Sequence, residues 1–148
     1  MKESILDYDV DRYSVDECAD SLFAALRSHD RARGCAWLAC LNPHSYAVAR
    51  NDALFSRALT DADWLVPDGA GIVLASRMSG GGIRERVTGS DVFRELHRRM
   101  NAAGGMSVFF LGATEETLAL IWARMAREYS NIRVAGTYSP PFKQRYAP

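Results

Sequence analysis

Apolar positions near the start of the chain repeat with the period of an α-helix. Leu22 and Leu26 recur on one helical face, and Ser14 and Glu17 have the spacing of a capping box. These features predict a helix from about residue 15 to residue 28. The next segment, "GCAWLACL", is a short and continuous apolar run, which is typical of a strand buried on both faces.

The two kinds of pattern continue to alternate along the rest of the chain. Helices are predicted over 43–50, 52–62, 71–78, 91–103 and 113–129, and strands over 34–41, 63–67, 106–112 and 131–138. Strands that alternate with helices favour right-handed crossover connections. The predicted fold class is therefore α/β, a Rossmann-like parallel sheet with helices on both faces, in a single domain over residues 1–148.

The segment "SGGGIRERVTGSD" interrupts this alternation at residues 79–91. It is too rich in glycine for a helix interior and too charged for a core strand. We therefore expect an exposed, mobile loop.

Composition and charge exclude several classes of function. The 148 residues hold 18 basic and 18 acidic side chains, so there is no overall electrostatic attraction for nucleic acid. No apolar run is long enough for a membrane-spanning helix, and the start is too acidic for a signal peptide, so a cytoplasmic protein is expected. Cys18, Cys35 and Cys40 lack CxxC spacing and are expected to be buried thiols. The three histidines form no cluster, and no metal is expected.

Three turns follow predicted strands and are candidates for ligand binding. They are Asn42-Pro43, Asp68-Gly69-Ala70-Gly71 and Gly112-Ala113-Thr114. Ligands of open α/β sheets bind beyond the carboxyl ends of the strands, where helix N-termini present N–H groups to anions. Gly69, Gly71 and Gly112 either let a ligand approach the backbone closely or only serve tight turns. Both interpretations stay open at this point.

Asp68 is a carboxylate beside a predicted helix N-terminus. It either caps that helix or acts as a general base that takes a proton from a sugar hydroxyl. The sequence pattern leaves the two roles open.

The charged loop offers a candidate anion site. Arg84 and Arg86 flank Glu85, and guanidinium groups suit the oxygens of a diphosphate, although solvated surface charge is the alternative. Thr88 or Asp91 is expected to cap the following helix, which would place its N-terminus, with Gly89, near a bound anion.

Several motifs together resemble one protein family. The order "LNPHSYAVAR", "ADWLVPDGAGIVLASR", "ERVTGSD", "VFFLGA" and "VAGTYSPPF", from about residue 35 to residue 142, is similar to the WecG/TagA/CpsF glycosyltransferases. The resemblance implies an inverting, metal-independent transfer of N-acetylmannosamine, its uronic acid or a related hexose. The donor is a UDP-sugar and the acceptor is linked to polyprenyl diphosphate. The products feed bacterial teichoic acid, enterobacterial common antigen or exopolysaccharide.

The resemblance also implies roles for individual residues. Asp68 matches the proposed general base, Asn42 a substrate contact, Arg86 a diphosphate contact, and Gly112 a turn that lines the nucleotide pocket. Cys40 stands where the family has a threonine. Lipid acceptors imply peripheral contact with the inner face of the plasma membrane, and a homo-oligomer that completes the site stays open.

Family members continue well beyond the segment "SPPFKQRYAP" at which this sequence stops. Three interpretations follow: an active glycosyltransferase, a non-catalytic nucleotide-binding remnant of the family, or a structural domain that binds a partner.

Overall fold

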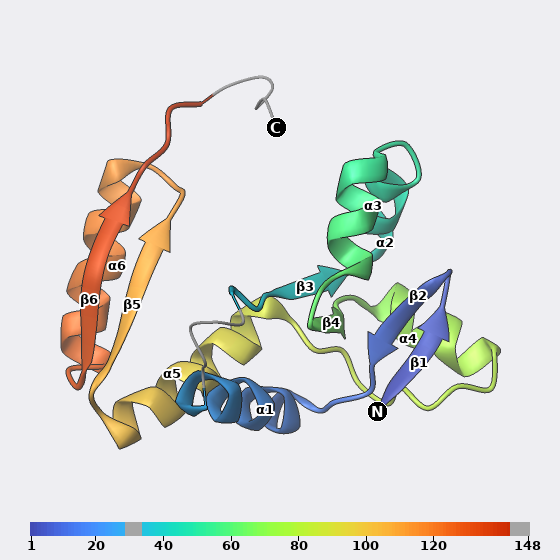
Figure 1. Cartoon of the computed structure of the whole chain (residues 1–148), viewed down its shortest axis with the longest axis horizontal. Helices are drawn as coiled ribbons and strands as arrows, with labels where there is room; N and C mark the ends of the chain where they lie inside the picture. The colour runs from blue at the N-terminus through green and yellow to red at the C-terminus, as the bar shows by residue number, and fades with distance from the viewer. Residues whose placement is uncertain (29–33, 143–148) are drawn as a thin grey trace. The chain divides into compact units, whose positions relative to one another are not determined.

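The computed structural model describes residues 1–28 and 34–142 (Figure 1). In chain order the elements are β1 (Lys2–Ile5), β2 (Tyr8–Asp11), α1 (Val15–Arg27), β3 (Leu38–Leu41), α2 (Pro43–Ala49), α3 (Ala53–Thr60), β4 (Trp64–Pro67), α4 (Ala70–Met78), α5 (Gly89–Ala103), β5 (Met106–Leu111), α6 (Glu115–Glu128) and β6 (Ile132–Tyr138). The chain divides into two compact units, Met1–Leu96 and His97–Pro148, and their boundary falls within α5. The α/β class is confirmed.

The parallel pair of β3 and β4 is the centre of the first unit. Cys40 lies opposite Val66, and Leu41 lies opposite Pro67. Leu41 packs into a core with α2, α3 and α4, whereas Cys40 and Val66 pack into a second core with α1 and α5. Because alternate side chains of a strand point to opposite faces, this pair is covered by helices on both faces, as predicted (Figure 1).

An N-terminal hairpin that the sequence analysis did not predict also belongs to the first unit. β1 and β2 pair antiparallel around Leu6 and Asp7, which both have positive φ, as in the tight turns of two-residue hairpins. Tyr8 and Val10 are buried, and the Asp11 carboxylate accepts a hydrogen bond of 3.0 Å from the N–H of Leu65. The hairpin therefore binds to the edge of β4 through a side chain. The described strands form three two-stranded sheets, of which two are parallel.

The second unit contains the parallel pair of β5 and β6 with α6. Leu118 and Met125 are the buried residues of α6, and Thr114 caps its first turn. The register shifts between Val108 and Phe109, beside Gly136. A Cβ at Gly136 would lie 2.8 Å from the ring of Phe109, so the glycine makes room for this aromatic side chain.

Two expectations need correction. The loop after α4 is not exposed throughout, because Ile83 and Val87 are fully buried in the cores of the first unit. Apolar side chains of a glycine-rich segment can still anchor it. Cys18 is buried as expected and Cys40 is half-buried, but Cys35 is exposed.

Candidate functional site

Three helices begin beside the carboxyl ends of β3 and β4. α2 begins after Asn42, α4 after Gly69, and α5 after Thr88. The N–H of Val87 donates to the C=O of Pro67 at 2.8 Å, which holds the start of α5 against the end of β4. The first unit therefore gathers three helix N-termini at one edge of the parallel pair, as expected for an anion-binding α/β protein.

Asp68 lies at the centre of this edge. Its N–H donates to the C=O of Leu41 at 2.8 Å, so the backbone continues the parallel pairing for one more residue. α4 has Gly69 as its N-cap and no side-chain cap, so the helix-cap alternative for Asp68 is wrong. The backbone of Asp68 is thus held by the parallel pair, and its half-exposed carboxylate forms no capping hydrogen bond to α4.

Asn42 presents its amide to this carboxylate. The Oδ1 atom accepts from the N–H of Ser45 at 2.8 Å, and this capping bond leaves the Nδ2 atom 3.5 Å from Asp68 Oδ2. The donor and acceptor sides of the amide are therefore fixed by the start of α2. Asn42 and Asp68, predicted separately, are brought together.

Cys40 of β3 lies close to Asp68 and to Gly89 at the start of α5. Burial raises the pKa of its thiol, and the negative charge of Asp68 raises this pKa further, whereas a hydrogen bond from the N–H of Gly89 opposes both effects. Cys40 therefore stays a neutral thiol beside the carboxylate. Its contact with Gly89 also ties the start of α5 to β3.

The glycines of the Asp68 turn have clear packing roles. Gly69 has a φ of +118°, which other residues rarely adopt. A Cβ at Gly71 would lie 2.8 Å from Pro43 Cγ, so only glycine lets α4 begin this close to α2. The close approach that glycine permits is thus between two parts of the chain, and an additional contact with substrate stays a prediction.

Thr88 and Asp91 form the N-terminal cap of α5. The Thr88 hydroxyl accepts from the N–H of Asp91 at 3.1 Å and lies 2.7 Å from the Asp91 carboxylate, which also pairs with Arg94 at 3.2 Å. The predicted capping by Thr88 is confirmed. Both side chains already form hydrogen bonds at the start of α5. Their contact with substrate stays a prediction, and it would have to be made in addition to these bonds.

Arg84 and Arg86 are exposed beside the same edge. The Arg77 side chain donates to the C=O of Arg84 at 3.3 Å, and the Glu85 carboxylate accepts from the N–H of Val15 at 3.3 Å. Within residues 1–28 and 34–142, neither Arg84 nor Arg86 uses its guanidinium group in a hydrogen bond or ion pair. These hydrogen bonds fix the backbone of the segment 84–86, whereas the guanidinium groups of Arg84 and Arg86 stay available to bind an anion.

The anchor of this loop is Glu3, which the sequence analysis missed. Its carboxylate accepts from the Ser76 hydroxyl at 2.6 Å and from the N–H of Gly82, and lies 3.9 Å from Arg12. The alternation of polar and apolar residues in "KESILDYDVD" is the signal that could have revealed a strand here.

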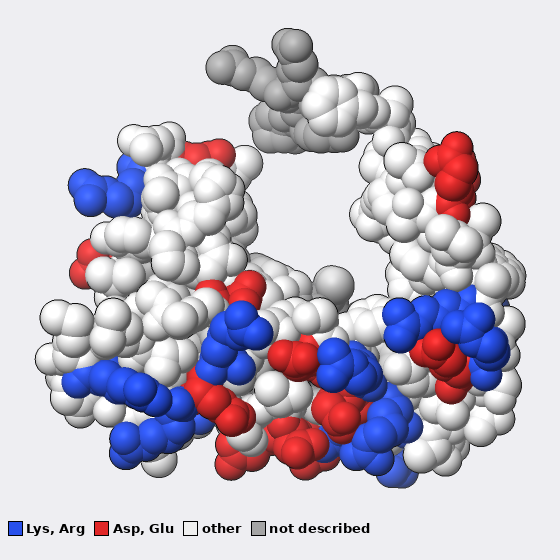
Figure 2. Space-filling model, turned by 180° about the vertical axis from the view of Figure 1, so that it is seen from behind, with Lys and Arg blue, Asp and Glu red and all other residues white. Residues whose placement is uncertain are grey.

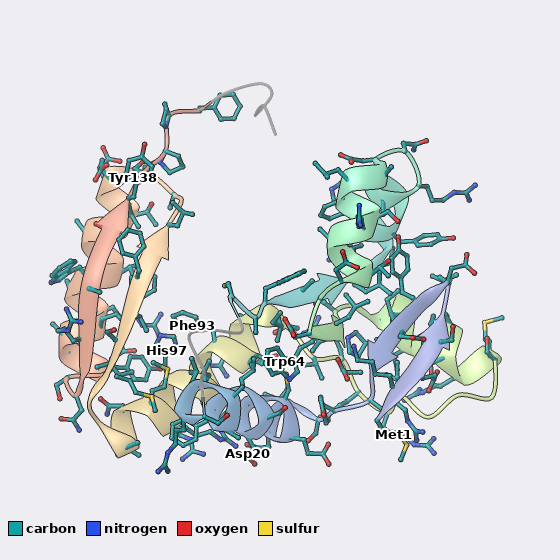
Figure 3. The ribbon with its side chains drawn as sticks, viewed as in Figure 1. Met1, Asp20, Trp64, Phe93, His97 and Tyr138 are labelled. Atoms are coloured by element: carbon teal, nitrogen blue, oxygen red, sulfur yellow. The ribbon has the colours of Figure 1, made fainter. Side chains whose placement is uncertain are left out.

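A groove of about 530 Å³ runs between α4 and the segment 84–86. Its lining includes Ala70, Gly71, Leu74, Arg77, Arg84 and Arg86. A second hollow of about 490 Å³ involves Trp64, whose indole N–H donates to Ser21 at 2.9 Å (Figure 3). Ala70 and Gly71 of the first groove follow Asp68 and Gly69 in the chain, whereas Trp64 of the second hollow lies at the opposite end of β4.

Gly112 belongs to the second unit. It follows β5 with a φ of +111°, and its N–H donates to the C=O of Tyr138 at 2.9 Å. Its predicted role in a nucleotide pocket stays a prediction.

Three further observations concern surface charge, metal ligands and helix length. Lysines and arginines are interspersed with acidic residues on the face in Figure 2 and form no continuous basic surface there. Among the described residues, no group of His, Cys, Asp and Glu is placed to hold a metal ion, and no helix is both long and apolar enough to cross a membrane.

Comparison with known proteins identifies the family to which the chain belongs. The model of the glycosyl transferase WecG/TagA/CpsF family matches residues 3–147, and the chain belongs to this family. It is 30% identical over 107 residues to the N-acetylglucosaminyldiphosphoundecaprenol N-acetyl-beta-D-mannosaminyltransferases of Bacillus subtilis (strain 168) and Bacillus spizizenii. Each match covers 72% of this chain and 41% of the relative.

Proposed function

We propose that this chain transfers a sugar from a UDP-sugar to a polyprenyl-diphosphate-linked acceptor, with inversion and with Asp68 as the general base. The observation that carries the proposal is the half-exposed Asp68 carboxylate, which is fixed by β4 and does not cap α4. The names of the two Bacillus relatives support a mannosaminyl donor group and a lipid-diphosphate acceptor.

In the proposed reaction, Asp68 accepts the proton of the acceptor hydroxyl as that oxygen attacks the anomeric carbon of the donor sugar. The bond from the anomeric carbon to the phosphate oxygen breaks, and UDP leaves with the electron pair. Attack from the face opposite the leaving group inverts the anomeric centre. Asn42, 3.5 Å from Asp68, orients the carboxylate or the acceptor hydroxyl.

The leaving diphosphate gains negative charge, which nearby positive groups would stabilise. Arg86 is exposed and joins directly to Val87, whose N–H bonds to Pro67 beside Asp68. The N-terminus of α5, with Gly89, adds N–H groups and the positive end of a helix dipole. We assign Arg86 and this helix start to the donor diphosphate.

The test is a transfer assay with the 148-residue chain, UDP-N-acetylmannosamine and a short-chain N-acetylglucosaminyl diphosphoprenol. Asp68→Asn should lower turnover by at least about a hundredfold, as for the loss of a general base, while UDP binding by calorimetry stays within about twofold. Equal turnover in parent and variant would refute the role of Asp68. UDP binding by the parent without any transfer would instead support the non-catalytic, nucleotide-binding alternative.

A further inference from the structure

The groove beside α4 has an apolar floor on one face of a helix. Ala70, Val73, Leu74 and Arg77 follow the spacing i, i+3, i+4 and i+7, so they lie along one side of α4. Leu74 is 58% exposed, whereas Ile72 on the other side is buried in the core. Because Leu74 is part of the groove lining, an apolar ligand in the groove would cover its exposed surface.

The rim of the groove is positively charged. Arg77 and Arg84 contribute two positive charges to the lining, next to Glu85 and to Arg86, which is assigned to the donor diphosphate. The Glu85 carboxylate bonds to the start of α1, and the guanidinium groups of Arg84 and Arg86 have no partner among the described residues. A diphosphate that joins a sugar to an alcohol carries two negative charges, which the guanidinium groups of Arg77 and Arg84 can pair with.

The ligand that fits both properties is an amphiphile with a diphosphate and a hydrocarbon chain. A nucleoside in the same place would set polar base and ribose groups against apolar side chains, which costs desolvation without new hydrogen bonds. We propose that this groove binds the diphosphate and first isoprene units of the acceptor, with Arg84 on the diphosphate and Leu74 on the isoprenoid. The inference rests on the proposed function, which requires such an acceptor.

The position of the groove agrees with this assignment. Its lining includes Ala70 and Gly71, which begin α4 directly after Asp68 and Gly69. A diphosphate bound there would leave the acceptor sugar beside the Asp68 carboxylate. Met78 is 80% exposed and lies one helical turn beyond Leu74, so it extends the apolar surface for later isoprene units.

Calorimetry with two probes tests the groove without requiring turnover. The first probe is N-acetylglucosaminyl diphosphofarnesol, and the second is the methyl diester with the same sugar and diphosphate but no isoprenoid. The parent chain should prefer the farnesyl probe, and Leu74→Glu should remove this preference, roughly a tenfold change. Arg84→Ala should weaken the binding of both probes by roughly tenfold.

Matched controls lie on α3 of the same unit. Leu54 is 70% exposed, and Arg57 forms an exposed ion pair with Asp61, so Leu54→Glu and Arg57→Ala should leave the binding of both probes unchanged. Equal binding of both probes by the parent, or a farnesyl preference that survives Leu74→Glu, would overturn the groove assignment.

UDP binding, measured in parallel, separates this inference from the proposed function. If the parent chain binds UDP and transfers sugar, but the preference for the farnesyl probe persists in Leu74→Glu, the groove assignment alone is overturned. A lipid preference lost in Leu74→Glu, in a chain that neither binds UDP nor transfers sugar, would support the groove and overturn the proposed function.

Discussion

The Glu3 carboxylate accepts a hydrogen bond from the Ser76 hydroxyl at 2.6 Å, which joins β1 to α4. The same hydroxyl accepts from the N–H of Ile83 at 3.1 Å, and Glu3 also accepts from the N–H of Gly82. An N-terminal hairpin thus fixes the loop that leads to Arg84. The placement of the arginines depends on a residue about 80 positions away in the chain.

Glu3→Gln should destabilise the first unit. The substitution keeps the shape of the side chain but replaces one acceptor oxygen by an N–H₂ group, which faces the N–H of Gly82 or the Ser76 hydroxyl. We expect a loss of about 1–3 kcal/mol in the free energy of unfolding, measured by urea denaturation. Asp61→Asn, which removes an exposed i,i+4 pair with Arg57, should cost less than about 0.5 kcal/mol. Equal effects of the two substitutions would contradict the anchoring role of Glu3.

The contribution of Glu3 should disappear in acid. Burial raises its pKa, but hydrogen bonds from Ser76 and Gly82 and the charge of Arg12 outweigh burial, so the pKa lies below its ordinary value of 4.5. A carboxyl group with a lowered folded-state pKa stabilises the fold above its unfolded-state pKa, and this stabilisation is lost as the pH falls through the folded-state value.

We therefore expect the largest difference in unfolding free energy between the parent and Glu3→Gln near neutral pH. This difference should shrink as the pH falls below 4.5. Urea denaturation of both chains at steps down to about pH 3 measures this difference. A difference that stays constant over the whole range would show that the ionised carboxylate is not the stabilising group.

Gly71→Ala should separate the starts of α2 and α4. The new Cβ would lie 2.8 Å from Pro43 Cγ, and a rigid proline ring cannot move aside as a flexible side chain would. We expect a destabilisation of about 1–3 kcal/mol by thermal or urea denaturation.

Gly89→Ala is the matched control for this prediction, because it also changes the start of a helix. Its Cβ would lie at an ordinary 3.6 Å from Cys40 Sγ, so the change in stability should stay within about 1 kcal/mol of zero. A larger loss at Gly89 than at Gly71 would contradict the packing described for the Asp68 turn.

The three thiols should react with alkylating reagents in a fixed order. Cys35 is exposed, whereas burial raises the pKa of Cys18 to about 12 and, together with the charge of Asp68, also raises that of Cys40. Iodoacetamide near pH 8 should therefore label Cys35 first, and Cys18 and Cys40 only after unfolding, because the thiolate is the reactive form. Mass spectrometry of peptides identifies the labelled thiols, and early labelling of Cys40 in the folded chain would contradict its neutral state.

Local sequence signals predicted the elements that depend on short-range patterns. The capping box of Ser14 and Glu17 is present at the start of α1, and Thr88 caps α5. Such bonds join residues three positions apart, so their spacing is visible in the sequence. The hairpin of β1 and β2 escaped prediction because its turn residues, Leu6 and Asp7, are not the usual Asn-Gly signal.

The sequence by itself determined the alternation of helices and strands, the family, the candidate residues Asn42 and Asp68 at the ends of strands, and Arg86 in the charged loop. Only the tertiary structure decided that Asp68 does not cap α4, that Gly71 makes room for Pro43, and that Glu3 anchors the arginine loop. The physical reason is distance along the chain. Periodicity and capping depend on neighbours within a few residues, whereas these three relationships depend on which distant segments the packing of the core brings together.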